Sequence, residues 1–324
     1  MKIVVAGEAP RLAESAPSPL ALAIGNFDGV HRGHQQLVRV AAEIAGRTGG
    51  TAGVLTFDPH PARVFAPALA PPLIVSLTRR LELLGEAGAQ LAIVESFTPA
   101  LAAVEPEAFV RDVLVGGLGA REVVVGYDFS FGRARRGTPA LLRELGAGLG
   151  LGVTVVPPVT VDGLVCSSTK VREFVLEGRV EGAALLLGRP VELQGPVVRG
   201  AGRGRGLGIP TANVAPEGEL VPRLGIYAAR ARVLDAAGGV ASTHAAALSI
   251  GSNPTFVPAG AGLVSVEAHL LDFDGDLYSK RIRLEVLHRL RDERRFDSVD
   301  ALMKQIAEDI AQTRSFLSTF ATAP

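Results

Sequence analysis

The sequence is poor in the residues that mark secreted and membrane-spanning proteins. Cys166 is the single cysteine among 324 residues, so neither an intramolecular disulfide nor a cysteine zinc cluster can form. The opening stretch 1–5 is too short, and too soon followed by Gly7, to be a signal peptide. No apolar run approaches the ~18 residues that a membrane-spanning helix needs. We therefore expect a cytoplasmic protein that makes no use of a membrane.

Excess positive charge and tryptophan are also missing. Lys and Arg together number 33, Asp and Glu also number 33, and tryptophan is absent. A neutral chain with only three tyrosines has neither the positive electrostatic field nor the aromatic stacking surfaces that are typical of a nucleic-acid-binding module. No Gly-Lys dipeptide occurs, which excludes a Walker A phosphate loop. Any phosphate must be bound by other means.

The first half of the chain alternates apolar segments with helical patterns. This alternation predicts an α/β unit whose parallel sheet is covered on both faces and binds ligands at the carboxyl ends of its strands. Thr138 and Pro139 are suited to begin the last of the helices. We expect strands over Leu20–Gly25, Thr51–Phe57, Leu91–Glu95, Glu122–Gly126 and Val153–Pro157, and helices over His34–Ala45, Leu77–Glu86, Glu107–Leu114 and Pro139–Leu145.

The second half has the alternating pattern of an antiparallel barrel. Strands are expected over Gly225–Leu234, Ala245–Ile250, Val264–Leu270 and Arg281–His288. The chain then ends in a long amphipathic helix, capped by Asp297 or Ser298, with Val299, Leu302, Met303, Ile306 and Ile310 on its apolar stripe. The change of pattern around the segment Leu187–Pro190 divides the chain into domains 1–184 and 185–324.

The first chemical signal follows the strand Leu20–Gly25, in the segment Asn26-Phe27-Asp28-Gly29-Val30-His31-Arg32-Gly33-His34. A helix that opens here would offer free N–H groups to a phosphate. His31 and His34 are three residues apart and can face one ligand, where they can stabilise developing phosphate charge. An incidental helix start and a metal site are the alternatives, although zinc lacks evident third and fourth ligands nearby.

A second segment supports the interpretation that residues 26–34 bind a phosphate. Ser167-Ser168-Thr169-Lys170-Val171-Arg172 places hydroxyls before a lysine and an arginine at a predicted helix start, an arrangement suited to a triphosphate. Alone, it would equally describe an ordinary N-cap with solvated charges.

Together these segments are similar to the nucleotidyltransferase superfamily. With Thr56-Phe57-Asp58-Pro59-His60-Pro61 and Gly126-Tyr127-Asp128-Phe129-Ser130-Phe131-Gly132, they resemble the adenylyltransferase module of prokaryotic bifunctional FAD synthetases. Class I aminoacyl-tRNA synthetases share the His-x-Gly-His element but need a lysine-rich second signature, which is not visible. The resemblance implies a Rossmann-like domain in which His31 and His34 are catalytic. It also implies nucleotide contacts by Gly25, Asn26, Phe27, Asp28, Ser167, Ser168, Thr169 and Arg172, and flavin contacts by Thr56, Asp58 and Asp128.

A glycine-rich segment opens the second half. Residues 200–213 place Arg203 and Arg205 between alternate glycines and end in Pro-Thr-Ala-Asn. A flexible loop is the plain alternative to an anion-binding flap. Thr211 and Asn213 supply oxygen ligands suited to Mg²⁺.

The segment Gly208–Val214 resembles the Pro-Thr-Ala-Asn signature of riboflavin kinases, and the segments 250–256, 266–278 and 290–297 agree with it in order. The resemblance implies a β-barrel kinase with Glu267 as catalytic base and Thr211 and Asn213 at Mg²⁺. It assigns nucleotide contacts to Gly202, Arg203, Gly204, Gly208 and Pro210, and flavin contacts to Asn253 and Arg291. The acidic run 272–276 lacks the order of a calcium loop and indicates a hairpin turn.

The two resemblances predict an enzyme with riboflavin, FMN and ATP as its partners. ATP is the co-substrate of both reactions, Mg²⁺ the cofactor, and flavins both substrate and product. An enzyme with one active half, a flavin-binding regulator and a nucleic-acid-binding module are the competing functions. The sequence leaves weak homo-oligomerisation open.

Overall fold

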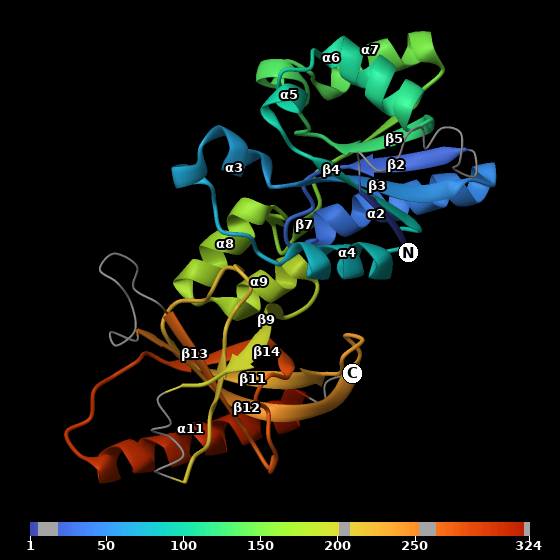
Figure 1. Ribbon diagram of the computed structural model, residues 1–324. Helices are drawn as coiled ribbons and strands as arrows, with labels where there is room; N and C mark the ends of the chain where they lie inside the picture. The colour runs from blue at the N-terminus through green and yellow to red at the C-terminus, as the bar shows by residue number, and fades with distance from the viewer. Residues whose placement is uncertain (6–18, 201–207, 253–263, 321–324) are drawn as a thin grey trace. The chain divides into compact units, whose positions relative to one another are not determined.

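The protein folds into two compact units in the computed structural model, which describes residues 1–5, 19–200, 208–252 and 264–320 (Figure 1). The first unit comprises Met1–Pro72 and Ser76–Ser168, and the second comprises Leu73–Val75 and Thr169–Pro324. The division at 168/169 precedes the boundary at 184/185 that the sequence indicates. The helices α8 (Ser168–Glu177) and α9 (Val180–Leu187) account for the difference, since α9 packs on strands of the second unit.

The first unit is built on a six-stranded sheet in the order β1-β4-β3-β2-β5-β6, and every neighbouring pair is parallel. The predicted parallel sheet is therefore confirmed, with β1 as an additional edge strand. All five residues of β2 are buried, as expected for a strand covered on both faces. The strands are β1 (Lys2–Val5), β2 (Leu20–Ile24), β3 (Thr51–Asp58), β4 (Leu91–Ser96), β5 (Ala120–Gly126) and β6 (Gly152–Val156).

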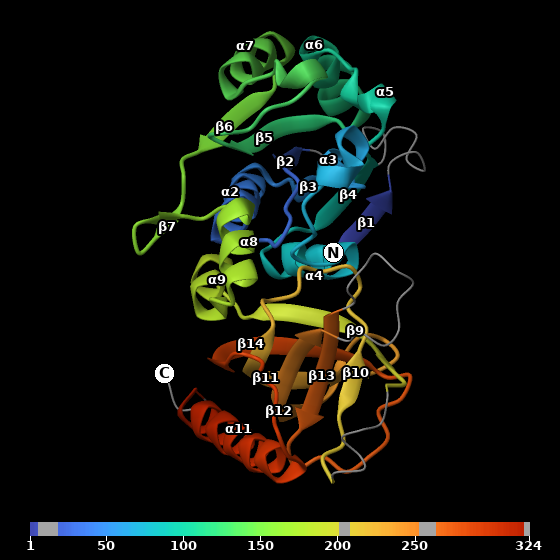
Figure 2. The same ribbon diagram turned by 90° about the vertical axis from the view of Figure 1, so that its left-hand side faces the viewer.

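Helices cover both faces of this sheet (Figure 2). On one face lie α2 (Arg32–Thr48) and α4 (Leu77–Glu86), and on the other α5 (Pro99–Ala102), α6 (Pro106–Ala108) and α7 (Pro139–Leu149). Thr138 caps α7 through its hydroxyl, which accepts the Leu141 N–H at 3.2 Å, as predicted. The helix expected over Glu107–Leu114 is instead the end of α6 followed by a π-helical segment over Phe109–Gly117.

The second unit is a closed barrel of six strands in the order β10-β13-β12-β11-β14-β9, all paired antiparallel. This confirms the predicted barrel. Sequence reasoning missed β9 and β10, because Gly195 and Pro196 interrupt the pattern of the first and the second is only three residues long. The strands are β9 (Val191–Val198), β10 (Ala212–Val214), β11 (Gly225–Leu234), β12 (Val240–Ser252), β13 (Val264–Leu270) and β14 (Arg281–Arg291).

The terminal helix α11 (Val299–Phe320) begins as predicted, because the Ser298 hydroxyl accepts the Ala301 N–H at 3.1 Å. It packs on β11, β12 and β14. The apolar stripe is only partly correct, since Val299 is 58% exposed. The most buried positions of the helix are instead polar, namely Gln305, Asp309 and Thr313.

Asp309 explains this polar stripe. Its carboxylate accepts hydrogen bonds from Nε and Nη2 of Arg291 at 2.8 and 2.6 Å, and from Gln305 at 3.0 Å. A paired guanidinium and carboxylate of this bidentate kind hold the helix on the end of β14. No helix in the described ranges is both long and apolar enough to cross a membrane.

A buried carboxyl lies in the loop before β11. Glu219 is 7% exposed, and its Oε2 accepts the Glu217 N–H at 2.7 Å. Burial raises the pKa of Glu219 to about 7, while the backbone N–H groups of Glu219 and Glu217 work against that rise. The folded protein therefore binds a proton at Glu219 that the unfolded chain has lost between pH 5 and 7.

We predict that replacing Asp309 by Ala will lower the free energy of unfolding of the barrel unit by about 3 kcal/mol, because it leaves the Arg291 charge without its carboxylate in a largely buried place. Chemical denaturation followed by circular dichroism measures the effect. Glu308→Ala, on the exposed face of the same helix, is the control and should stay within about 0.5 kcal/mol. Equal stability of the two variants would contradict this role of Asp309.

We also predict that stability falls as pH rises from 5 to 8. A carboxyl whose pKa is raised in the folded state favours folding less once it must ionise, and the loss is on the order of 3 kcal/mol for a shift to about 7. Glu219→Gln should abolish most of this fall, whereas Glu308→Gln should keep it. An unchanged pH dependence in Glu219→Gln, measured by urea denaturation at both pH values, would refute the assignment.

Candidate active sites

The first site is built on the turn between β2 and α2, at the carboxyl end of the sheet. The turn leaves β2 after Ile24 and places Phe27, Gly29 and Val30 at φ values of 51°, 81° and 41°. Positive φ at Phe27 and Val30 is strained for residues with side chains. Both side chains are buried, at 0% and 1% exposure, so packing compensates the strain and fixes the start of α2.

The two predicted catalytic histidines are held against each other at this helix start. His31 is the N-cap of α2, and its Nδ1 accepts the His34 N–H at 3.4 Å. The two rings stack with centroids 3.6 Å apart and an angle of 19° between their planes. Because Nδ1 is the acceptor, the proton of a neutral His31 ring lies on Nε2. The pair therefore forms one surface at the positive end of a helix.

Gly33 makes this stacking sterically feasible. A Cβ at this position would lie 3.1 Å from the His31 ring and 3.4 Å from the carbonyl oxygen of Cys166. The first separation is tighter than ordinary van der Waals contact, and the second is at its lower limit. The glycine of the His-x-Gly-His element thus lets the segment before α8 approach the start of α2.

The second predicted phosphate segment meets the turn through Ser168. Its hydroxyl donates to the backbone carbonyl of Asp28 at 2.9 Å, across 140 residues of sequence. Ser167 is half-buried beside it. Thr169 and Arg172 lie on the first turns of α8, which pack with the second unit.

The three side chains predicted to contact flavin lie at neighbouring strand ends. Thr56 and Asp58 belong to the end of β3, and Asp128 follows β5. Thr56 is fully buried, and its hydroxyl donates to the Asn26 carbonyl at 3.2 Å. Asp58 is half-buried and Asp128 is exposed. Thr56 is therefore placed as a support of the β2–α2 turn, whereas the carboxylates of Asp58 and Asp128 can meet a ligand.

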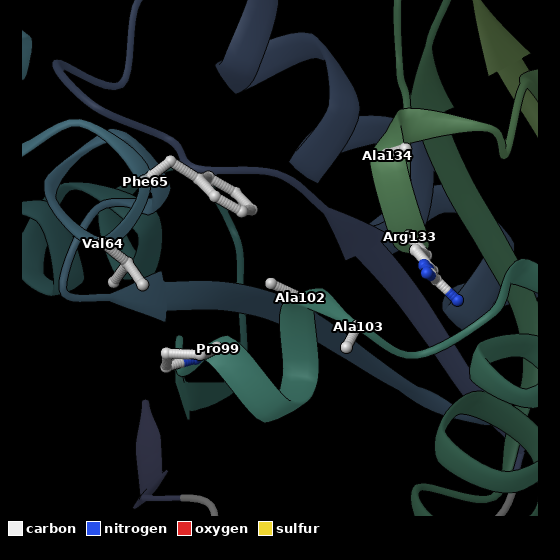
Figure 3. Close-up of a pocket in the computed structure, with 7 residues that line it drawn as sticks. All are labelled: Val64, Phe65, Pro99, Ala102, Ala103, Arg133 and Ala134. Carbon is white, nitrogen blue, oxygen red and sulfur yellow. The ribbon is translucent and has the colours of Figure 1, made fainter.

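A pocket that sequence reasoning missed lies in the same unit (Figure 3). It has a volume of about 370 Å³, and the Phe65 ring and the Arg133 guanidinium are its largest lining groups. Phe65 is 67% exposed, which is unusual for so large an apolar side chain. Its signal in the sequence is a phenylalanine in an Ala- and Pro-rich stretch. The lining residues are Val64, Phe65, Pro99, Ala102, Ala103, Arg133 and Ala134.

The barrel brings the second set of predicted residues together. Asn213 on β10 is directly opposite Glu267 on β13, so both side chains lie on the same face of the pair. The Thr211 hydroxyl donates to Oε2 of Glu267 at 3.2 Å. Gly200 leaves room for Asn213, because a Cβ there would lie only 2.3 Å from the Asn213 amide nitrogen. A hydroxyl, an amide and a carboxylate thus form one cluster.

The remaining residues predicted for this site lie beside the cluster, lie outside the described residues, or are engaged elsewhere. Pro210 offers its carbonyl to Nδ1 of His269 at 2.8 Å, and Gly208 has a φ of 74°. Gly202, Arg203, Gly204 and Asn253 lie outside the residues that the structure describes. The guanidinium of Arg291 is engaged by Asp309, so this structure shows Arg291 as an anchor for α11. Among described residues, no group of three or more His, Cys, Asp and Glu could hold a metal ion.

The fold and the two clusters together define a class of protein. A parallel sheet with stacked histidines at its first crossover helix, joined to a barrel with a Thr, Asn and Glu cluster, is a two-part enzyme of phosphoryl and nucleotidyl transfer. A family model described as FAD synthetase matches residues 13–170, and one described as riboflavin kinase matches residues 187–317. The chain belongs to the family of bifunctional riboflavin kinase/FMN adenylyltransferases.

Curated relatives of this name resemble the chain over nearly its whole length. The protein of Pseudomonas fluorescens is 38% identical over 292 residues, covering 90% of this chain and 91% of the relative. That of Listeria monocytogenes is 36% identical over 299 residues, with 92% of each chain covered. That of Escherichia coli K12 is 34% identical over 306 residues, covering 94% of this chain and 95% of the relative.

A solved structure shows the same likeness of fold. The crystal structure of a protein described as a macrolide-efflux protein, from Streptococcus pneumoniae, has a TM-score of 0.83 and 28% sequence identity. It covers 97% of this chain and 99% of that one. Both units therefore have counterparts in one solved chain.

We predict that His31→Ala will lower the rate of FAD formation from FMN by about 100- to 1000-fold, the effect of removing one donor from a charge-stabilising site. Phosphorylation of riboflavin should continue at the normal rate, because Glu267 lies in the other unit. Thr138→Ala removes an N-cap from α7 in the same unit and is the control for lost helix stability. Parallel loss of both activities in a folded His31→Ala protein would contradict the assignment.

Proposed function

We propose that this chain catalyses two successive reactions with ATP: the barrel unit phosphorylates riboflavin to FMN, and the parallel-sheet unit adenylylates FMN to FAD. The observation that carries the proposal is that each unit holds its own polar cluster, built from residues of that unit alone. His31 and His34 stack at the start of α2, and Thr211 contacts Glu267 in the barrel. Family membership supplies the identities of the substrates.

In the adenylyl-transfer reaction, a phosphate oxygen of FMN attacks the α-phosphorus of ATP and pyrophosphate leaves. No covalent enzyme intermediate is required, because positioning supplies much of the rate. We assign His31 and His34 to the phosphate oxygens on which charge develops, with Nε2 of His31 as a donor. The helix start, Asn26 and Ser168 would hold the triphosphate. Arg172 and the other predicted contacts stay predictions.

In the kinase reaction, the 5′-hydroxyl oxygen of riboflavin attacks the γ-phosphorus of ATP and ADP leaves. Glu267 would accept the hydroxyl proton as the new P–O bond forms. Its carboxylate already accepts a hydrogen bond from Thr211, which limits its orientation. The reaction balances without a further reactant, since the proton released by riboflavin ends on Glu267 and then passes to solvent.

The donors around Glu267 fit Mg²⁺. A hydroxyl, an amide oxygen and a carboxylate are hard oxygen ligands, and Mg²⁺ in phosphotransferases is held by few protein groups together with phosphates and water. Thr211 and Asn213 would hold the ion, which when bound neutralises charge on the ATP phosphates. The paucity of carboxylates among the described residues of this cluster suits an ion that arrives with the nucleotide.

The pocket at Phe65 suits the ring system of FMN. Its walls are mostly apolar side chains, Phe65 offers a flat face, and Arg133, whose Nη1 donates to Glu105 at 3.2 Å, is its polar group. It belongs to the same unit as the stacked histidines. We assign it to the flavin of the adenylyl-transfer reaction. The single thiol supports a cytoplasmic location for the enzyme.

We predict that Glu267→Gln will lower the rate of riboflavin phosphorylation by about 100- to 10,000-fold, the usual contribution of a general base. The amide keeps the size of the side chain and its contact with Thr211 but cannot take the proton. FAD formation from added FMN should be unchanged, and this serves as the internal control. A normal rate of FMN formation, with the products separated by chromatography, would show that Glu267 is not the base.

A further inference from the structure

Arg80 is the most deeply buried charged side chain of the first unit that no assigned role explains. It lies on α4 and is 0% exposed. Its Nη1 donates to the backbone carbonyls of Asn26 and Phe57 at 3.2 and 3.1 Å, and approaches the Thr56 hydroxyl at 3.4 Å. One nitrogen thus joins the β2–α2 turn to the end of β3.

The rest of the guanidinium is incompletely paired. Nε and Nη2 of Arg80 are buried and have no hydrogen-bond partner in the part of the chain that the structure describes. A buried donor without a partner destabilises the fold. An apolar side chain would avoid that penalty, so the hydrogen bonds of Nη1 do not by themselves give a sufficient reason for an arginine here. Incomplete pairing of this kind is concentrated at functional sites.

The surroundings of Arg80 supply such a reason. Burial lowers the pKa of Arg80, while the carboxylates of Asp28 and Asp58 raise it. An arginine nevertheless stays charged in a protein. Asp28 is 1% exposed and lies in the turn that precedes His31. Without a nearby cation, these carboxylates would repel the phosphates that the site must bind.

The turn is also held at a second point. Ser168 donates to the Asp28 carbonyl at 2.9 Å, whereas Arg80 and Thr56 both donate to the Asn26 carbonyl. The backbone between and after these two carbonyls contains the strained positions Phe27 and Val30. A conformation of this kind persists only when its surroundings fix it.

We infer that Arg80 is a positioning residue for adenylyl transfer: it fixes the Asn26 carbonyl, and through the strained turn it sets the place of His31 and His34. The inference rests on the proposed adenylyl-transfer function of this unit. Its charge also compensates Asp28 and Asp58 beside the phosphates. Arg80 itself is buried and touches neither substrate nor phosphate.

The test uses the full chain with Arg80→Met and Arg80→Lys. We expect Arg80→Met to lower kcat for FAD formation from FMN by about 100-fold, since small displacements of catalytic groups have effects of this size, with a much smaller change in the KM for FMN. Arg80→Lys should recover part of kcat, because lysine keeps the charge but cannot reproduce the planar donor group. Riboflavin phosphorylation by the same preparations should be unchanged.

Arg79→Met is the matched control. Arg79 precedes Arg80 on α4 and is 7% exposed, but its guanidinium pairs at 2.8 and 2.9 Å with Glu82 and Glu86 of its own helix. If Arg80 contributed only to stability, Arg80→Met and Arg79→Met would be affected alike. Each would yield less folded enzyme, with kcat per folded molecule unchanged, and a lower assay temperature would restore the loss. The proposal requires kcat to fall in the Arg80 variants alone.

Two results would overturn the proposal. One is a kcat in Arg80→Met equal to that of the unaltered protein; the other is an equal loss in Arg79→Met. Should Arg80→Met fail to fold, Arg80→Lys decides, and wild-type kcat in that variant would refute the positioning role. The unaltered protein is assayed first: absence of FAD there would refute the proposed function itself, and the inference with it.

Discussion

The stacking of His31 on His34 is the interaction on which the adenylyl-transfer site depends, and it requires three separate supports. Gly33 lacks the Cβ that would press on the His31 ring. The turn from Phe27 to Val30 adopts positive φ values that only a packed environment maintains. Hydrogen bonds to the carbonyls of Asn26 and Asp28, from β3, α4 and the first residue of α8, hold that turn in place. The sheet contributes position alone, since the strand ends bring these groups to one edge.

In the barrel, strand register rather than a strained turn brings the site residues together. Asn213 and Glu267 meet because β10 and β13 pair with these two residues opposite each other, and a slip of one residue would send the side chains to opposite faces. Buried polar residues in the barrel are paired: Glu285 accepts from Arg232 at 2.5 Å, and Arg283 donates to Gln194 at 2.8 Å. Arg283 and Glu285 of β14 are themselves largely buried, at 8% and 6% exposure.

Hydrophobic periodicity, together with the capping, glycine and proline residues between segments, predicted most of the fold, including the parallel sheet, the barrel and the caps Thr138 and Ser298. The misses have physical causes. β9 was hidden by Gly195 and Pro196. The polar stripe of α11 exists because Asp309 pairs with Arg291 of β14, and no helical pattern shows such a tertiary contact. The clusters at His31 and at Glu267 follow from motifs whose spacing carries chemistry. Arg80 and Phe65 belong to no such motif: each acquires its place only when segments far apart in sequence come together, so sequence reasoning could not find them.

The central claim is that one chain carries both chemistries, each in its own unit. The most direct measurement is a time course of the purified protein with riboflavin, ATP and Mg²⁺, with flavins separated by chromatography. We expect FMN to appear first and FAD to follow, and FAD alone to form when FMN replaces riboflavin. A folded protein that produces neither flavin nucleotide would contradict the account and would favour a protein that binds flavins without converting them.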